Sequence, residues 1–173
     1  LYSILDAEGN EVAGGCRPAD APAVSLYVPD ARLWGIDDPY LYTVTATLQR
    51  RNEAYDQVTV KAGVRSFSCD PDRGFILNGA ETPLRGVSRH QDRLYKGNAL
   101  TREDHYEDAK IIKELGANTI RLAHYQHSQD FYDACDELGF IIWAEIPFIS
   151  VFNKDPEAHV NCMNQLKELI IQN

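Results

Sequence analysis

The sequence has few cysteines, no surplus of positive charge and no long apolar run. Its four cysteines lie far apart without a C-x-x-C spacing, which argues against a zinc site. The formal net charge of −9 leaves no concentrated basic face, so we do not expect nucleic acid as a partner. No apolar run is long enough to span a bilayer, so no membrane partner is predicted either. The remaining composition, with 44% apolar and 25% charged residues, is typical of a globular protein.

The first 68 residues have the pattern of short β-strands. β-rich runs are separated by Pro, Gly, Asp and Asn, without a helical period between them, and they cover residues 1–6, 11–13, 24–28, 42–48 and 57–62. This spacing predicts an antiparallel β-sandwich over residues 1–68. A seven-stranded sandwich uses roughly 100 residues, so we expect this one to be incomplete.

A hairpin is predicted after this region. Residues 68–74 are rich in turn formers and end the last strand pattern. Two apolar arms, residues 75–77 and 80–85, then flank Asn78-Gly79, which is the strongest two-residue turn signal. We therefore place the boundary between two domains after residue 68.

The second half of the chain alternates between strand and helix signals. Residues 84–92, 118–125 and 140–145 each predict an apolar strand that ends in ionisable residues, and a helix signal follows each of them. Polar groups at the carboxyl ends of such strands are typical of a (β/α)8 TIM barrel. Residues 69–173 are therefore predicted to hold the first three βα units. A complete barrel needs roughly 250 residues, so we expect the chain to be a piece of a larger protein.

Capping residues mark three helices in this half. They predict starts at Thr101, Ser128 and Asp155, and left-handed ends at Gly116 and Gly139. Cys135 lies in the apolar stripe of the second helix and is predicted to be buried. The third helix carries a stripe of apolar residues, namely Val160, Met163, Leu166, Leu169 and Ile170.

Arg121 is a cation inside an otherwise apolar strand. An unpaired guanidinium there would be costly, so we expect a carboxylate partner. The pair is either purely structural or positions a carboxylate that takes part in chemistry. Glu145 ends the next strand beside Trp143, where burial would raise its pKa unless it were paired. Glu145 is also the candidate partner of Arg121, and the two interpretations are compatible.

Five histidines divide into two groups. His90 and His124 end consecutive strands and are expected side by side, where imidazoles donate hydrogen bonds to ligand hydroxyls or bind metal. His90, Asp92 and His124 form a partial metal set, but no His-x-His or H-E-x-x-H spacing supports metal catalysis. The other three lie on or beside helix signals and are predicted to be solvated; they are His105, His127 and His159.

Several motifs, in order along the chain, resemble those of one enzyme family. They occupy residues 33–42 (LWGIDDPYLY), 61–65 (KAGVR), 75–79 (FILNG), 85–90 (RGVSRH), 120–125 (IRLAHY), 132–139 (YDACDELG) and 143–145 (WAE). Each motif alone is weak, but the order and spacing together make chance an insufficient explanation. The chain resembles glycoside hydrolase family 2, the family of β-galactosidases, β-glucuronidases and β-mannosidases.

The resemblance implies an incomplete immunoglobulin-like β-sandwich followed by the first three βα units of the TIM barrel. It also implies a retaining mechanism, in which two carboxyl groups about 5–5.5 Å apart act as acid/base and nucleophile. Family members carry these glutamates after later strands, the first in an Asn-Glu pair. Here the pair Asn52-Glu53 lies in the sandwich region. We therefore expect no catalytic residue in this chain, and the isolated chain is expected to be inactive.

The resemblance also implies roles for individual residues. The substrate-binding candidates are His90, Asp92, His124 and Tyr125, and the supporting candidates are Arg121, Trp143 and Glu145. Some β-galactosidases of the family hold magnesium with a Glu and a His shortly after the third strand. Residues 146–151 (IPFISV) offer neither, so we predict no metal and no other cofactor in this chain.

These features predict a parent enzyme that is an exo-acting retaining β-glycosidase with a carbohydrate substrate, and a β-galactosidase is the first choice. The alternatives are a β-glucuronidase or another specificity of the family, and a non-catalytic carbohydrate-binding homologue. A non-glycosidase barrel hydrolase is disfavoured by the motif order. We expect the isolated chain to associate or to be marginally stable. The sequence leaves the sugar, the compartment and a homo-oligomeric state of the parent open.

Overall fold

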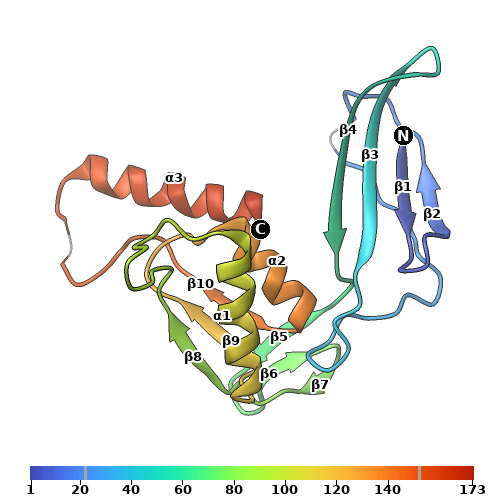
Figure 1. The fold of residues 1–173 in the computed structure, drawn as a ribbon. Helices are drawn as coiled ribbons and strands as arrows, with labels where there is room; N and C mark the ends of the chain where they lie inside the picture. The colour runs from blue at the N-terminus through green and yellow to red at the C-terminus, as the bar shows by residue number, and fades with distance from the viewer. Residues whose placement is uncertain (22, 152) are drawn as a thin grey trace. The chain divides into compact units, whose positions relative to one another are not determined.

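The computed structural model describes residues 1–21, 23–151 and 153–173 (Figure 1). The chain divides into two compact units, Leu1–Thr82 and Pro83–Asn173. The boundary predicted after residue 68 and this division differ by a small hairpin sheet, which the structure groups with the first unit.

The first unit contains a four-stranded antiparallel sheet. Its strands are β1 (Tyr2–Leu5), β2 (Glu11–Gly15), β3 (Tyr42–Arg50) and β4 (Glu53–Ala62), in the order β2-β1-β3-β4. Arg51 and Asn52 connect β3 to β4 with φ angles of 54° and 67°. Two successive left-handed residues match the right-handed twist of a tight hairpin, which explains the sharp reversal here.

The strand predicted at residues 24–28 is wrong. These residues form no strand, although their alternation favours extended backbone. Leu26 instead packs by its side chain on β2, because its Cδ2 atom lies 3.1 Å from where a Cβ on Gly15 would be. Pro29 follows the segment and has no N–H to donate to a ladder. The alternation of apolar and polar residues favours an extended backbone, but a strand also needs a neighbouring strand with free backbone N–H and C=O groups.

Trp34 is the fully buried centre of the first unit. Its backbone N–H donates to the Val64 carbonyl at 2.9 Å, and the Arg65 guanidinium lies 4.6 Å from the ring centroid. A Cβ on Gly63 would come within 2.7 Å of the Trp34 Cβ, so only glycine permits this approach. Asn78 Nδ2 donates to the Trp34 carbonyl at 2.9 Å. Three of the motifs found in the sequence therefore meet at one tryptophan.

The predicted Asn-Gly hairpin is confirmed. A second, three-stranded sheet contains β5 (Phe67–Asp70), β6 (Gly74–Leu77) and β7 (Ala80–Glu81). Between β6 and β7, Asn78 and Gly79 have φ angles of 50° and 83°. Both values lie in the left-handed region that this type of turn requires.

The second unit is a parallel sheet with alternating helices. Its elements, in chain order, are β8 (Gly86–Arg89), α1 (Arg102–Glu114), β9 (Thr119–Leu122), α2 (Gln129–Leu138), β10 (Ile141–Ala144) and α3 (Pro156–Gln172). The strands lie in the order β10-β9-β8 and are all parallel, so their carboxyl ends share one edge. A Cβ on Gly86 would lie 2.0 Å from the Thr119 carbonyl oxygen, which makes glycine necessary at the start of β8.

The predicted helix ends are confirmed. Thr101 and Asp104 form a complete capping box at the start of α1, and Gly116 follows that helix with a φ of 79°. Ser128 caps α2, which ends at the left-handed Gly139. Asp155 accepts the hydrogen bond of the Glu157 N–H at the start of α3.

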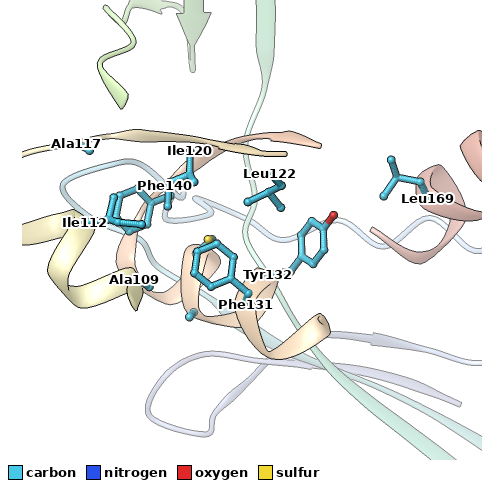
Figure 2. Close-up of a cluster of buried hydrophobic side chains, with 11 residues drawn as sticks. Ala109, Ile112, Ala117, Ile120, Leu122, Phe131, Tyr132, Phe140 and Leu169 are labelled. Atoms are coloured by element: carbon cyan, nitrogen blue, oxygen red, sulfur yellow. The ribbon is translucent and has the colours of Figure 1, made fainter. Parts of the chain in front are cut away.

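The core of the second unit lies between the sheet and its first two helices. Figure 2 shows Ile120 and Leu122 of β9 facing Ile112 of α1 and Phe131 of α2, all of them buried. Cys135 is buried in the same cluster, as predicted. In the apolar stripe of α3, only Leu169 is buried. No described helix is long and apolar enough to cross a membrane.

Candidate active site at the carboxyl ends of the parallel strands

The parallel sheet of the second unit has two different faces. Ser88, Arg121 and Trp143 lie opposite one another in the register of β8, β9 and β10. Their neighbours along the strands point to the other side, because strand side chains alternate. On that side Arg89 and Leu122 are buried against the helices, whereas Arg121 and Trp143 are exposed. The sheet therefore has one helix-covered face and one open face.

Glu145 collects hydrogen bonds on the open face. Arg121 donates to it through Nε at 2.7 Å and Nη2 at 3.1 Å, and the Trp143 indole N–H donates at 3.0 Å. The carboxylate partner predicted for Arg121 is thus found. The hydrogen bonds from Arg121 hold the pKa of Glu145 below its usual range, so the carboxylate is ionised.

His124 joins the same group through Nδ1. This atom lies 2.8 Å from Arg121 Nη2 and 3.3 Å from Glu145 Oε2. A guanidinium can only donate, so the shorter contact makes Nδ1 an acceptor and places the imidazole proton on Nε2. His124 therefore keeps an N–H that is suited to donate to a ligand hydroxyl.

His90 and Tyr125 complete the cluster of predicted residues. The His90 and His124 rings meet edge to face, with centroids 5.1 Å apart. The Tyr125 hydroxyl lies 3.4 Å from His90 Nδ1 and accepts from the Gln91 N–H at 3.4 Å. Asp92 is exposed, and its carboxylate makes no hydrogen bond or ion pair within residues 1–21, 23–151 and 153–173. The structure thus brings together six of the seven predicted site residues and leaves Asp92 beside them in sequence only.

The prediction that three histidines are solvated is wrong for two of them. His159 is exposed, but His105 and His127 retain only 3% and 5% of their exposure. Both rings face Arg89, whose Nη2 lies 3.0 Å from His105 Nδ1 and whose Nη1 lies 3.3 Å from His127 Nδ1. Burial lowers the pKa of His105, and it lowers the pKa of His127 to about 4, so both imidazoles are neutral.

Arg89 is the centre of this second cluster, which sequence reasoning missed. Asp108 accepts from its Nε and Nη2 at 2.9 and 2.6 Å, and the guanidinium lies 3.8 Å from the Phe131 ring centroid. A signal was available: Arg89 occupies a helix-facing position in the strand alternation, which requires polar partners on the covering helices. We call Arg89, His105, Asp108 and His127 the Arg89 cluster.

The loop after β8 is tied to α1 by charge. Arg93 pairs with Asp104, Glu107 and Asp108, and Lys96 donates to both oxygens of Asp104 at 2.7 Å. The hydrogen bond from Lys96 is the main reason why the pKa of Asp104 falls to about 2. These contacts fix the course of the chain directly after His90 and Asp92.

Among the residues that the structure describes, no group of three or more His, Cys, Asp and Glu is arranged to hold a metal ion. The paired side chains of the open face are instead hydrogen-bond donors and a single ionised carboxylate. Such a set orients a ligand that is rich in hydroxyl groups.

The fold and the site define a β-sheet unit followed by the start of an α/β barrel with polar residues at its strand ends. Comparison with known families agrees: the family "Glycosyl hydrolases family 2" matches residues 3–65, and "Glycosyl hydrolases family 2, TIM barrel domain" matches residues 71–169. The chain belongs to glycosyl hydrolases family 2, as the resemblance of its motifs predicted.

Relatives of two specificities are similar to the chain. A β-glucuronidase of Bacteroides fragilis is 46% identical over 125 residues, which are 72% of this chain and 18% of the relative. The β-galactosidase BoGH2A of Bacteroides ovatus is 37% identical over 164 residues, or 91% of this chain and 19% of the relative. The chain thus spans about a fifth of the length of these curated relatives.

One solved structure is more similar still. The crystal structure of an FMN-binding β-glucuronidase from Faecalibacterium prausnitzii L2-6 is 69% identical and has a TM-score of 0.95, covering 98% of this chain and 26% of that one. A putative β-galactosidase of Bacteroides fragilis is 38% identical with a TM-score of 0.86.

Proposed function

We propose that the whole protein is an exo-acting, retaining β-glycosidase that removes terminal β-D-glucuronic acid. The specificity is carried by one observation, the 69% identity to a solved β-glucuronidase over 98% of the chain. The 46% identity to a curated β-glucuronidase points the same way. These relatives favour glucuronides over galactosides, which were the first choice from the sequence.

In this proposal the open face forms one side of the sugar site. His90, His124 and Tyr125 contact hydroxyl groups, and Arg121 holds Glu145 and the His124 ring in place. Asp92 supplies a free carboxylate for a further hydroxyl. In this proposal these residues lie at the carboxyl ends of the strands of the first three βα units of an eight-fold barrel. Trp143 offers an exposed aromatic face for a pyranose ring.

The bond-breaking glutamates are placed outside residues 83–173, because this region contains no Asn-Glu pair. Residues 1–173 alone should therefore hydrolyse no glycoside. A whole protein that lacks both glutamates would instead be a carbohydrate-binding homologue. The sequence after the fourth and seventh barrel strands of the whole protein distinguishes the two cases.

A β-galactosidase is the second candidate, and the similarity to BoGH2A over 91% of the chain favours it. Purified whole protein should be assayed on nitrophenyl β-D-glucuronide and nitrophenyl β-D-galactoside under identical conditions. A kcat/KM at least tenfold higher for the glucuronide is expected. Preference for the galactoside would replace the first candidate by the second, and hydrolysis of neither would refute both.

FMN has no step in the proposed reaction, since glycoside hydrolysis transfers no electrons between substrate and enzyme. The proposal therefore includes no cofactor held by this chain.

A further inference from the structure

The Arg89 cluster lies on the helix-covered face, directly behind the residues proposed to contact the sugar. Arg89 is followed in sequence by His90, and Ala123 is followed by His124. The Ala123 N–H donates to the Arg89 carbonyl at 3.1 Å, which extends the pairing of β8 and β9 by one residue. The backbone of the cluster and the backbone of the two site histidines are therefore continuous.

His127 connects the guanidinium to the same residue from the other side. Its Nε2 lies 3.2 Å from the Ala123 carbonyl, which can only accept, so the proton of the neutral imidazole is on Nε2. Nδ1 is then the acceptor for Arg89 Nη1 at 3.3 Å. Arg89 thus contacts both backbone polar groups of Ala123. The Arg89 carbonyl accepts from the Ala123 N–H, and the Arg89 guanidinium holds the His127 ring that donates to the Ala123 carbonyl.

A buried arginine is a poor choice for stability alone. Removing a guanidinium from water is costly, and replacing a buried ion pair by apolar side chains of similar volume is often neutral or stabilising. Arg89 nevertheless lies 5% exposed among two imidazoles, one carboxylate and one aromatic ring. The fixed fork of the guanidinium offers something an apolar side chain lacks, namely several hydrogen bonds in set directions.

We propose that His127, which Arg89 helps to orient, is a positioning residue for the sugar site, because its Nε2–H fixes the Ala123 backbone and thereby holds the His124 ring beside His90 and Arg121. This inference rests on the proposed function, since it concerns the same site. His105 and Asp108 hold the guanidinium in place. None of the four residues of the Arg89 cluster touches the substrate.

Two substitutions of His127 separate its two hydrogen bonds. In His127→Gln the terminal amide lies near the position of Nε2 and can still donate to Ala123. In His127→Asn the shorter amide lies near Nδ1, so it can accept from Arg89 but cannot reach Ala123. Ile112→Ala is the matched control, because it weakens the same core without touching the Arg89 cluster.

Steady-state kinetics of the whole protein should distinguish positioning from stability. A merely destabilised enzyme loses active molecules, which lowers the apparent kcat and leaves KM unchanged. We expect His127→Asn to raise KM for the hydrolysed nitrophenyl glycoside about tenfold and His127→Gln to stay within about threefold, as for other indirect ligand supports. Ile112→Ala should keep the wild-type KM. Equal KM values for Asn, Gln and wild type, or an equal rise for Asn and Gln, would overturn the proposal.

A crystal structure of whole His127→Asn tests the inference independently of activity. The His124 ring should leave its position, so that the 2.8 Å contact with Arg121 is lost and the 5.1 Å spacing to His90 changes. If the His124 ring has not moved in the variant, the positioning role of His127 is refuted, whether or not the protein hydrolyses a glycoside. Absence of hydrolysis alone would refute only the proposed function. If His127→Asn does not fold, 15N-histidine NMR of the wild type decides: a proton on Nδ1 of His127 would exclude the connection to Ala123.

Discussion

The two arginines on neighbouring strands of the parallel sheet stand in opposite surroundings. The Arg89 side chain is 5% exposed and faces the helices, whereas the Arg121 side chain is 43% exposed and faces the open side. Each pairs with one carboxylate and contacts an imidazole Nδ1 atom. The sheet thus contains two arginine–carboxylate pairs with neighbouring imidazoles. The burial of each arginine decides whether losing its carboxylate lowers stability strongly or mainly changes the site.

The largest difference is expected when each carboxylate becomes an amide. Asp108→Asn leaves the buried Arg89 charge without compensation, so the free energy of unfolding should fall by about 3 kcal/mol. Glu145→Gln should cost less than about 1 kcal/mol, because the unpaired Arg121 side chain is 43% exposed and stays in contact with water. Urea unfolding followed by circular dichroism measures both. Equal losses would remove the distinction between the two clusters.

Acid should affect the two faces in different pH ranges. The buried His127 has a pKa of about 4, below the 6.5 of an unfolded histidine, so the unfolded chain binds the extra proton first. The contribution of His127 to the free energy of unfolding is present above pH 6.5 and is lost as the pH falls to about 4. It amounts to at most about 3 kcal/mol. The titratable and charged groups near His127 and His105 are Arg89, His90, Asp104, Asp108 and Asp130.

Glu145 provides the contrast within the same titration. Its pKa is lowered by Arg121, so its contribution is present above the unfolded value of 4.5 and is lost only at lower pH. Unfolding measured between pH 6.5 and pH 4.5 therefore reports on the buried imidazoles. His127→Gln should flatten the curve in this range, while Glu145→Gln should leave it unchanged. A wild-type curve that is already flat there would contradict a neutral, buried His127.

A smaller effect is expected from His124→Ala on the open face. The variant removes a hydrogen bond to a substrate hydroxyl, which is worth about 1.4 kcal/mol or a tenfold fall in kcat/KM. Its thermal unfolding should match the wild type, because the ring is partly solvated. His159→Ala, on the exposed side of α3, is the control for loss of an imidazole. Unchanged kinetics would remove His124 from the site.

Trp143→Phe should have the smallest effect on stability. It removes the 3.0 Å hydrogen bond to Glu145, but the indole is largely solvated and Arg121 still holds the carboxylate. We expect a change below about 0.5 kcal/mol in the free energy of unfolding. A much larger loss would show that the open face is as tightly coupled as the buried one.

Features that depend on neighbouring residues were predictable. The helix start at Thr101 and the turn at Asn78-Gly79 need only a few adjacent side chains, and both were found as predicted. The carboxylate beside Arg121 was also predictable, since a cation within a strand demands a partner. Glu145 was the nearest acidic residue at the end of the adjoining strand.

Features that depend on distant packing were not. The burial of His105 and His127 follows from the side of each helix that meets Arg89, and helix periodicity alone did not reveal it. Residues 24–28 alternate like a strand, but whether a strand forms depends on a neighbour that offers free backbone groups. The choice between glucuronide and galactoside likewise had no local signal in the motifs.

The two tryptophans give the chain a built-in pair of optical reporters. Trp34 is 0% exposed in the first unit, and Trp143 is 66% exposed in the second. A shielded indole emits at shorter wavelength than one in water, so the blue and red sides of the emission spectrum describe different units. In a preparation of residues 1–173, loosening around Gly63 and Arg65 should alter the blue side, and a change beside Trp143 should alter the red side. Unfolding of the two units can thus be followed in one cuvette without a label.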